Sequence, residues 1–167
     1  LIPDFASEGE LKGTAKQFVN LLLEQKRETL KSRTGSLVEA TEADNRLLNI
    51  AGYAGLLLTG ASDKAFDLAS NNSQKVATLL ESIPLIPSQE IRNSLSERVI
   101  DALGEQNRVD VRLAAVKAMS TITTDLSNKF IVTAPLVKNS DLRESAVQVL
   151  LKIPRKNRDA AVAEQLA

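Results

Sequence analysis

The sequence contains two similar stretches, Asp110 to Ile122 and Asp141 to Ile153, whose first residues lie 31 positions apart. They read DVRLAAVKAMSTI and DLRESAVQVLLKI, and small or apolar residues occupy matching positions. The matched pairs include Val111 with Leu142, Ala115 with Ala146, Val116 with Val147, Met119 with Leu150, and Ile122 with Ile153. This spacing predicts an amphipathic helix in each copy, and the leading Asp is a favourable N-cap residue. We expect the two helices to lie side by side and nearly parallel, with Ala115, Met119, Ala146 and Leu150 buried between neighbouring units.

Weaker copies of the same pattern lie upstream. Asn71 to Ile83 and Asp44 to Leu56 keep several of the apolar positions, so the four copies begin about 27, 39 and 31 residues apart. A helix that recurs every 30 to 40 residues is the signature of an α-solenoid. The sequence therefore predicts an all-α fold without a sheet, an α-solenoid of antiparallel helix pairs. We expect one domain over residues 1–167, with an atypical N-terminal helix in 1–36 and about four helix pairs in 44–167.

The composition excludes several classes of function. The chain has 21 basic and 21 acidic residues, so it lacks the concentrated positive charge that nucleic acids and anionic membranes select. It has no His and no Cys, which removes the commonest general base, nucleophile and zinc ligands. Phosphate-loop and nucleophile-elbow motifs are also missing. We expect a protein that is not an enzyme and takes no cofactor or metal.

Turn residues place the other helices. The expected segments are Glu10 to Arg33, ending at Thr34-Gly35, then residues 47–62, 63–70, 74–83, 88–103, 125–138 and 157–166. Asn71 to Ser73, Ser88 and Asp125 are the expected N-caps, and Gly104 is the expected C-terminal glycine. Pro84 and Pro87 predict a hinge, and Pro135 predicts a kink within 125–138.

The run from Leu47 to Ser62 carries no charge, yet at 16 residues with three glycines it is too short for a membrane span. Gly52 and Gly55 predict close approach of a neighbouring helix. Tyr53, the only tyrosine, is expected in the core with its hydroxyl bound to a partner group.

Two groups of charged residues each permit a structural interpretation and a binding interpretation. Lys26, Arg27, Lys31 and Arg33 suit a solvated helix C-terminus, with a phosphate or acidic partner as the alternative. Asp110 and Asp141 with Arg112 and Arg143 suggest a charge ladder stacked between adjacent units, with ligand binding as the alternative.

The pattern Asp-Val/Leu-Arg-x-x-Ala-Val-x-x-Met/Leu, followed by a turn, a second helix and Asn-Ser-Asp, resembles the HEAT-like repeat superfamily, including the repeats related to phycobilisome lyases. The resemblance covers residues 110–154 well and 44–83 less closely, and it does not extend to 1–35. It implies stacked antiparallel helix pairs that bind a partner along an extended concave face formed by the second helix of each pair. It does not imply an enzyme.

Three functions follow as hypotheses. The first is a non-catalytic scaffold for protein–protein interaction. The second is an accessory or spacer domain of a larger multidomain bacterial protein, exported or not, which Leu1 in place of an initiator Met favours because it indicates a fragment. The third, a nucleic-acid-binding HEAT-like solenoid, is disfavoured by the zero net charge and the absence of Trp.

The expected partner is accordingly a protein or a neighbouring domain of the same chain, with no nucleic acid and no membrane span. We take 88–103, 125–138 and 157–166 as the second helices of the pairs. Residues off their apolar stripes are the candidates for partner binding: Arg92, Glu97, Asn128, Lys129 and Lys138.

Overall fold

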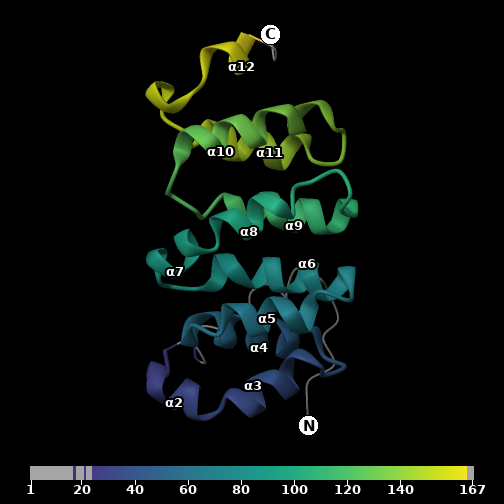
Figure 1. Ribbon diagram of the computed structural model, residues 1–167, viewed down its shortest axis with the longest axis vertical. Helices are drawn as coiled ribbons and strands as arrows, with labels where there is room; N and C mark the ends of the chain where they lie inside the picture. The colour runs from purple at the N-terminus through teal and green to yellow at the C-terminus, as the bar shows by residue number, and fades with distance from the viewer. Residues whose placement is uncertain (1–16, 18–20, 22–23, 165–167) are drawn as a thin grey trace.

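The computed structural model describes residues 17, 21 and 24–164 (Figure 1). The described residues form helices and no strands, so the predicted all-α class is confirmed. The α-helices are α2 (Arg27–Ser32), α3 (Thr34–Thr41), α4 (Arg46–Thr59), α5 (Ser62–Ala69), α6 (Ser73–Ser82), α7 (Gln89–Ser94), α8 (Ser96–Asp101), α9 (Val109–Met119), α10 (Leu126–Thr133), α11 (Arg143–Leu151) and α12 (Ala160–Glu164). Three short 3-10 helices, η1 (Ile83–Leu85), η2 (Ala134–Lys138) and η3 (Arg155–Asn157), join some of them.

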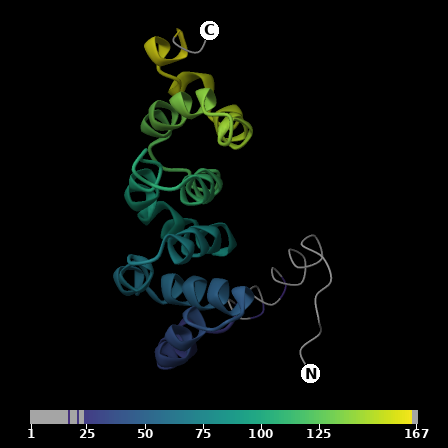
Figure 2. The same ribbon diagram turned by 90° about the vertical axis from the view of Figure 1, so that its right-hand side faces the viewer.

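The helices lie across the long axis of an elongated stack (Figure 1). The turns between helices alternate between the two sides of that view, so the chain crosses the stack in one direction and returns in the other. The recurring helices α4, α6, α9 and α11 form one layer, in which each contacts the next, and α5, α7, α8 and α10 form the second layer (Figure 2). The predicted side-by-side placement of the helices near Asp110 and Asp141 is confirmed by the contact of α9 with α11.

The pairing of the helices differs from the expectation. In the structure α5 packs on α6, α8 on α9, and α10 with η2 on α11. The segments 88–103 and 125–138 therefore precede their pairing partners, and the recurring helices are the second helices of the pairs. Sequence periodicity finds the helices but does not say which neighbour each one packs against.

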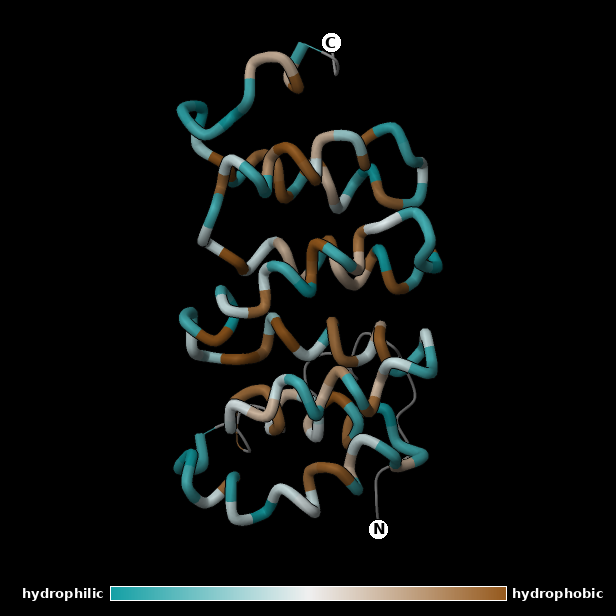
Figure 3. Tube along the Cα trace, in the orientation of Figure 1, coloured by the Kyte–Doolittle hydropathy of each residue, from teal (hydrophilic) through white to brown (hydrophobic). Residues whose placement is uncertain are grey.

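One hydrophobic core runs through the stack from α3 to α11, and apolar residues recur along every helix of it (Figure 3). Ala115, Met119 and Ala146 are buried, as predicted. Leu150 is only half-buried, so that part of the prediction is wrong. It packs beside a smaller cluster that contains Phe130 and Ile153, at the end of the stack where the short elements η3 and α12 follow.

Several helix boundaries differ from the predicted ones. Most of the predicted helix from Glu10 to Arg33 lies outside the described residues; within them, a turn at Glu24 and a non-helical Lys26 interrupt it. The predicted break at Thr34-Gly35 falls instead at Arg33, between α2 and α3. The predicted helix 88–103 is divided at Leu95, whose φ of −92° and ψ of 1° are not helical, and α8 ends at Asp101.

The C-terminal segments are also shorter than expected. The predicted kink at Pro135 is confirmed: α10 ends at Thr133 and the 3-10 helix η2 follows, because proline has no N–H to continue the α-helical ladder. The predicted last helix, 157–166, begins only at Ala160, and residues 165–167 lie outside the described part.

Side-chain caps follow the sequence at three of the predicted sites. Asn72, Ser88 and Asp125 accept hydrogen bonds from backbone N–H groups at the starts of α6, α7 and α10. The two leading aspartates are not N-caps, and that prediction is wrong. Asp110 lies in the first turn of α9, and near Asp141 it is Asn139 whose side chain accepts the Asp141 N–H at 3.0 Å.

The helix-ending glycine is Gly60 rather than Gly104. Gly60 follows α4 with a φ of 86°, the left-handed conformation that glycine adopts without steric cost. Gly104 lies beyond the end of α8 and has no positive φ.

Candidate functional site

Ion pairs join helices that belong to successive units. Arg46 pairs with Glu81, Lys75 with Glu42, and Arg98 with Asp63, across sequence separations of 35, 33 and 35. The Arg98 guanidinium also lies 4.6 Å from the centre of the Phe66 ring. These contacts tie each helix to one that follows it by 33 to 35 residues in the sequence.

A second set of contacts closes the connections between consecutive helices. In each, a cationic side chain donates to a backbone carbonyl near the end of the preceding helix, where the helix dipole and unpaired carbonyls favour positive charge. The contacts are Arg92 to Ile86 O, Arg112 Nε to Leu103 O at 3.0 Å, Lys129 Nζ to Ile122 O at 2.7 Å, Arg143 Nε to Val137 O at 2.9 Å, and Arg158 Nε to Ile153 O at 2.9 Å. We call these five contacts the carbonyl clamps.

The clamps replace the predicted charge ladder. Arg112 and Arg143 bind carbonyls five to nine residues upstream within their own connections, as Arg158 does, and do not stack on aspartates of adjacent units. The carboxylate of Asp110 instead accepts from Arg108 Nε at 3.2 Å. The sequence does show a cationic residue five to nine positions after the end of a predicted helix. It does not show that the cationic side chain folds back and binds a backbone carbonyl there.

The clamps also account for two of the five predicted partner residues. Lys129 is 4% exposed, so its expected place on a free surface is wrong. Burial lowers the pKa of Lys129 to about 8, and the charge of Lys152 acts in the same direction. Arg92 is half-buried, and its guanidinium donates to Ile86 O and, at 2.6 Å, to Gln89 Oε1.

The other three predicted residues remain accessible. Glu97 and Lys138 are exposed, and Asn128 is half-buried. All five lie in the layer of α7, α8 and α10 with η2, but within residues 24–164 no hydrogen bond or ion pair joins any two of them. The structure thus places them in one layer without assembling them into a site, and the partner-binding role of the accessible three stays a prediction.

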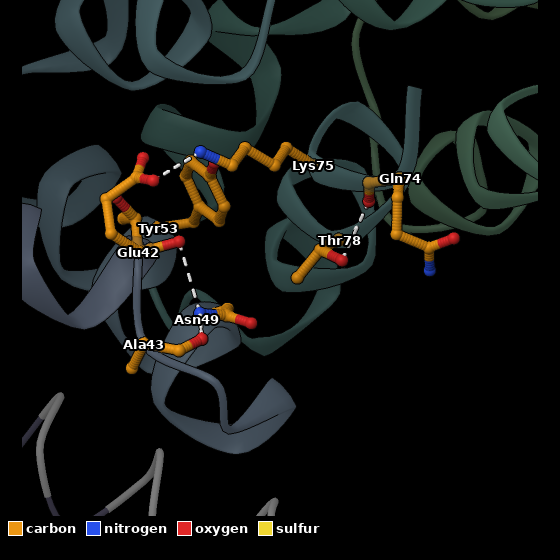
Figure 4. Close-up of a pocket in the computed structure, with 8 residues that line it drawn as sticks. Glu42, Ala43, Asn49, Tyr53, Gln74, Lys75 and Thr78 are labelled. Atoms are coloured by element: carbon orange, nitrogen blue, oxygen red, sulfur yellow. Dashed lines mark hydrogen bonds and ion pairs between the residues drawn. The ribbon is translucent and has the colours of Figure 1, made fainter. Parts of the chain in front are cut away.

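Sequence reasoning missed a small pocket between the α3–α4 turn and the start of α6 (Figure 4). Its volume is about 100 Å³, and it is lined by Thr41, Glu42, Ala43, Asn49, Tyr53, Gln74, Lys75 and Thr78. The lining comes from segments about 30 residues apart, so no local motif marks it. The one available signal was an isolated tyrosine in the uncharged run from Leu47 to Ser62.

Local packing fixes the tyrosine side of this pocket. Asn49 Nδ2 donates to the carbonyls of Ala40, Thr41 and Ala43 at 3.0, 3.1 and 2.8 Å, which ties the end of α3 to the first turns of α4.

The predicted close approach at the glycines of α4 is confirmed. A Cβ at Gly52 would lie 2.7 Å from Leu37 O, and one at Gly55 would lie 2.6 Å from Leu37 Cδ2.

Tyr53 is fully buried, as predicted. Burial raises the pKa of Tyr53 to about 12; the nearby Glu42 carboxylate adds to the rise, and a hydrogen bond with the Thr41 side chain opposes it. Tyr53 therefore stays protonated.

A larger cavity of about 310 Å³ lies between α2, the α4–α5 turn and α7. Arg27 and Glu90 line it with opposite charges, together with the polar residues Ser62, Ser88 and Ser94. The Glu90 carboxylate offsets the charge of Arg27. This cavity therefore does not favour the hypothesis that the basic residues near Arg27 bind a phosphate.

Comparison of the chain with protein-family models, with curated proteins and with solved structures gives no match. Across residues 24–164, no helix combines the length and the apolar character needed to cross a bilayer. The same residues contain no group of three or more acidic side chains arranged to hold a metal ion.

Proposed function

We propose that this chain is a non-catalytic protein-interaction scaffold built from HEAT-like helix pairs. The observation that carries the proposal is the elongated two-layer stack, in which each helix pair packs on its neighbours (Figures 1 and 2). Such a stack displays a continuous row of parallel helices, and a partner can contact several units at once.

The layer of α4, α6, α9 and α11 is the proposed interface. With the pairing that the structure gives, these are the second helices, the ones that the HEAT-like resemblance assigns to the partner face. Two of the five residues first chosen in the other layer, Arg92 and Lys129, are used in carbonyl clamps. On the proposed layer Lys117 of α9 and Glu144 of α11 are exposed, and neither forms an ion pair with a described residue.

A pair of charge-reversal variants tests the proposal. Lys117→Glu with Glu144→Lys alters the α9–α11 surface, and Glu97→Lys with Lys138→Glu alters the opposite layer. Each variant combines a first-turn acid with a last-turn base and leaves the net charge unchanged, so the two are closely matched. Exposed charges contribute roughly 0 to 1 kcal/mol to stability, so both variants should fold.

The assay is affinity capture from an extract of the source cells with quantitative mass spectrometry, followed by calorimetric titration of the purified captured protein. We expect the α9–α11 variant to lose binding at least roughly tenfold while the Glu97/Lys138 variant binds like the wild type. The reverse result would move the interface to the α7–α8–α10 layer. A wild-type chain that retains no protein in excess of the two variants would refute the scaffold function.

A further inference from the structure

Positive charge is concentrated in the turn that joins α11 to α12, at one edge of the stack (Figure 1). From Lys152 to Arg158, four of the seven residues are cationic and none is acidic. The side chains of Lys152, Arg155 and Lys156 are exposed, whereas Arg158 is half-buried and forms a carbonyl clamp with Ile153 O. We call Lys152, Arg155 and Lys156 the basic edge.

Packing adds a further cation to this region. The 3-10 helix η3, which holds Arg155 and Lys156, contacts α10, where Lys129 is buried. Burial lowers the pKa of Lys129, and the charge of Lys152 lowers it as well. The ammonium groups of Lys129 and Lys152 therefore lie near enough to repel each other, so the positive potential here is not local to one side chain.

No described acidic side chain pairs with the basic edge. The ion pairs within residues 24–164 involve none of its members. Asp125 and Asp159 are the acidic residues nearest along the chain to α10 and η3, and each accepts a backbone N–H at a helix start, at 3.3 and 3.0 Å. The N–H groups of the basic edge thus stay available for an external carboxylate.

Charge is unevenly distributed along the stack, although the net charge is zero. Residues 81–110 hold six acidic and three basic side chains, whereas residues 126–158 hold two acidic and seven basic ones. A long polyanion lying along the stack would meet the acidic middle, where like charges repel it. A short acidic segment can contact the basic edge alone.

The apolar surroundings indicate the kind of partner. Leu151, beside Lys152 in the last turn of α11, is 66% exposed and offers an apolar contact next to the cations. Phe130, the one aromatic residue within 126–158, is 4% exposed, so no ring of this region is free to stack on a base or to lie in a membrane interface. This surface suits a polypeptide better than a nucleic acid or a bilayer.

We propose that the basic edge, together with Leu151, binds an acidic segment of the partner polypeptide that carries carboxylates around an apolar side chain. The Arg155 guanidinium can donate two parallel hydrogen bonds to one carboxylate, so Arg155 is the expected anchor. The basic edge follows directly on α11, a helix of the proposed interface layer. The assignment to a partner polypeptide rests on the proposed scaffold function, whereas the charge argument does not.

A peptide titration tests the site. The full chain is titrated into a fluorescently labelled, blocked peptide of four glutamates around one leucine, and binding is read by anisotropy. The same peptide with glutamines in place of the glutamates is the neutral control. Inorganic salt is kept at physiological ionic strength, where charges more than about 8 Å apart in solvent are largely screened.

Two charge-reversal variants locate the binding. Arg155→Glu with Lys156→Glu alters the basic edge, and Lys31→Glu with Lys64→Glu alters exposed lysines of α2 and α5. Both variants change the net charge by the same amount, so they differ in the place of the change. All four side chains are exposed, so both variants should fold, which circular dichroism checks.

We expect the glutamine peptide to bind at least roughly tenfold more weakly than the glutamate peptide. The Arg155/Lys156 variant should lose affinity for the glutamate peptide by roughly tenfold, and the Lys31/Lys64 variant by less than about twofold. In the NMR spectrum of the labelled wild-type chain, the glutamate peptide should shift amide signals of residues 150–158 and of α10 most.

Equal binding of the two peptides, unchanged binding in the Arg155/Lys156 variant, or equal losses in the two variants would overturn the proposal. Tighter binding of duplex DNA or of phosphatidylserine vesicles than of the glutamate peptide would also overturn it, because the edge would then select phosphates. These titrations need no captured partner, so their failure leaves the scaffold test standing, and failure of the scaffold test leaves the peptide result standing.

Discussion

Lys129 provides the sharpest test of the energetics of this fold. Its ammonium group lies in the core, 4% exposed, and donates to Ile122 O at 2.7 Å. Its pKa falls from 10.5 in an unperturbed lysine to about 8 in the folded chain, chiefly because burial penalises the charged form. Folding therefore favours the neutral amine, and the unfolded chain holds this proton more tightly than the folded chain does.

The sign of the pH dependence follows directly. Between about pH 8 and pH 10.5 the unfolded state binds more protons than the folded state, so the free energy of unfolding rises with pH in this window. Below the folded pKa both states are protonated and the cost of the buried charge is fully present. Linkage with these two pKa values gives a gain of about 2 kcal/mol from pH 7 to pH 9.5. Tyr53 opposes the gain only above about pH 10, because its pKa is raised and the unfolded state loses its proton first.

Urea denaturation followed by far-UV circular dichroism at several pH values up to 9.5 measures this effect. Lys129→Met keeps the apolar stem and removes the amine, and should abolish the rise. Lys138→Met, at an exposed lysine of η2, is the matched control and should keep it. Equal pH slopes in the wild type and in Lys129→Met would show that the buried amine does not titrate as argued.

Three further predictions concern packing and charge. Ala146→Asp places an unpaired charge in the core between α9 and α11 and should lower the free energy of unfolding by roughly 3 to 5 kcal/mol in urea denaturation; a wild-type midpoint would contradict the burial of this position. Gly52→Ala should cost about 1 to 3 kcal/mol by the same assay, because its Cβ would lie 2.7 Å from Leu37 O. Gly35→Ala is its control: nothing lies within 4 Å of a Cβ there, so this helical glycine should gain up to about 1 kcal/mol, and equal effects at the two glycines would refute the packing argument. Finally, the wild-type chain should bind duplex DNA no more tightly than about 10⁻⁴ M at physiological salt, and micromolar binding in a gel shift would contradict the argument from net charge.

The sequence predicted the helices better than their ends. Apolar spacing of three and four residues marks a helix wherever one face is buried, so the recurring helices and most of their neighbours were visible. The exception is α3, the helix that packs on α4, which was expected only as a connection. The break before α3 was predicted at Thr34-Gly35, next to its actual place at Arg33. The break at Leu95 was not predicted, because leucine lacks the turn preference of glycine or proline.

Lys129 could have been recognised as buried. It follows Leu126 by three positions and precedes Thr133 by four, so it lies on the helix stripe that faces the core. Its charge suggested an exposed position, and the carbonyl that compensates the charge lies in the preceding connection. The Tyr53 pocket offered no comparable signal, because Tyr53 and Lys75 come together only through the packing of α4 on α6.

The carbonyl clamps have a consequence for the response of the stack to force. Each clamp joins residues five to nine positions apart, so pulling the two ends of the chain apart along the long axis hardly loads it. The load falls instead on the interfaces between units, which share the apolar core and to which surface ion pairs such as Arg46 with Glu81 add about 1 kcal/mol or less each. Under tension the units should separate one after another while each connection between helices keeps its shape, so the stack extends in steps and recoils when released, as a chain of stiff links does.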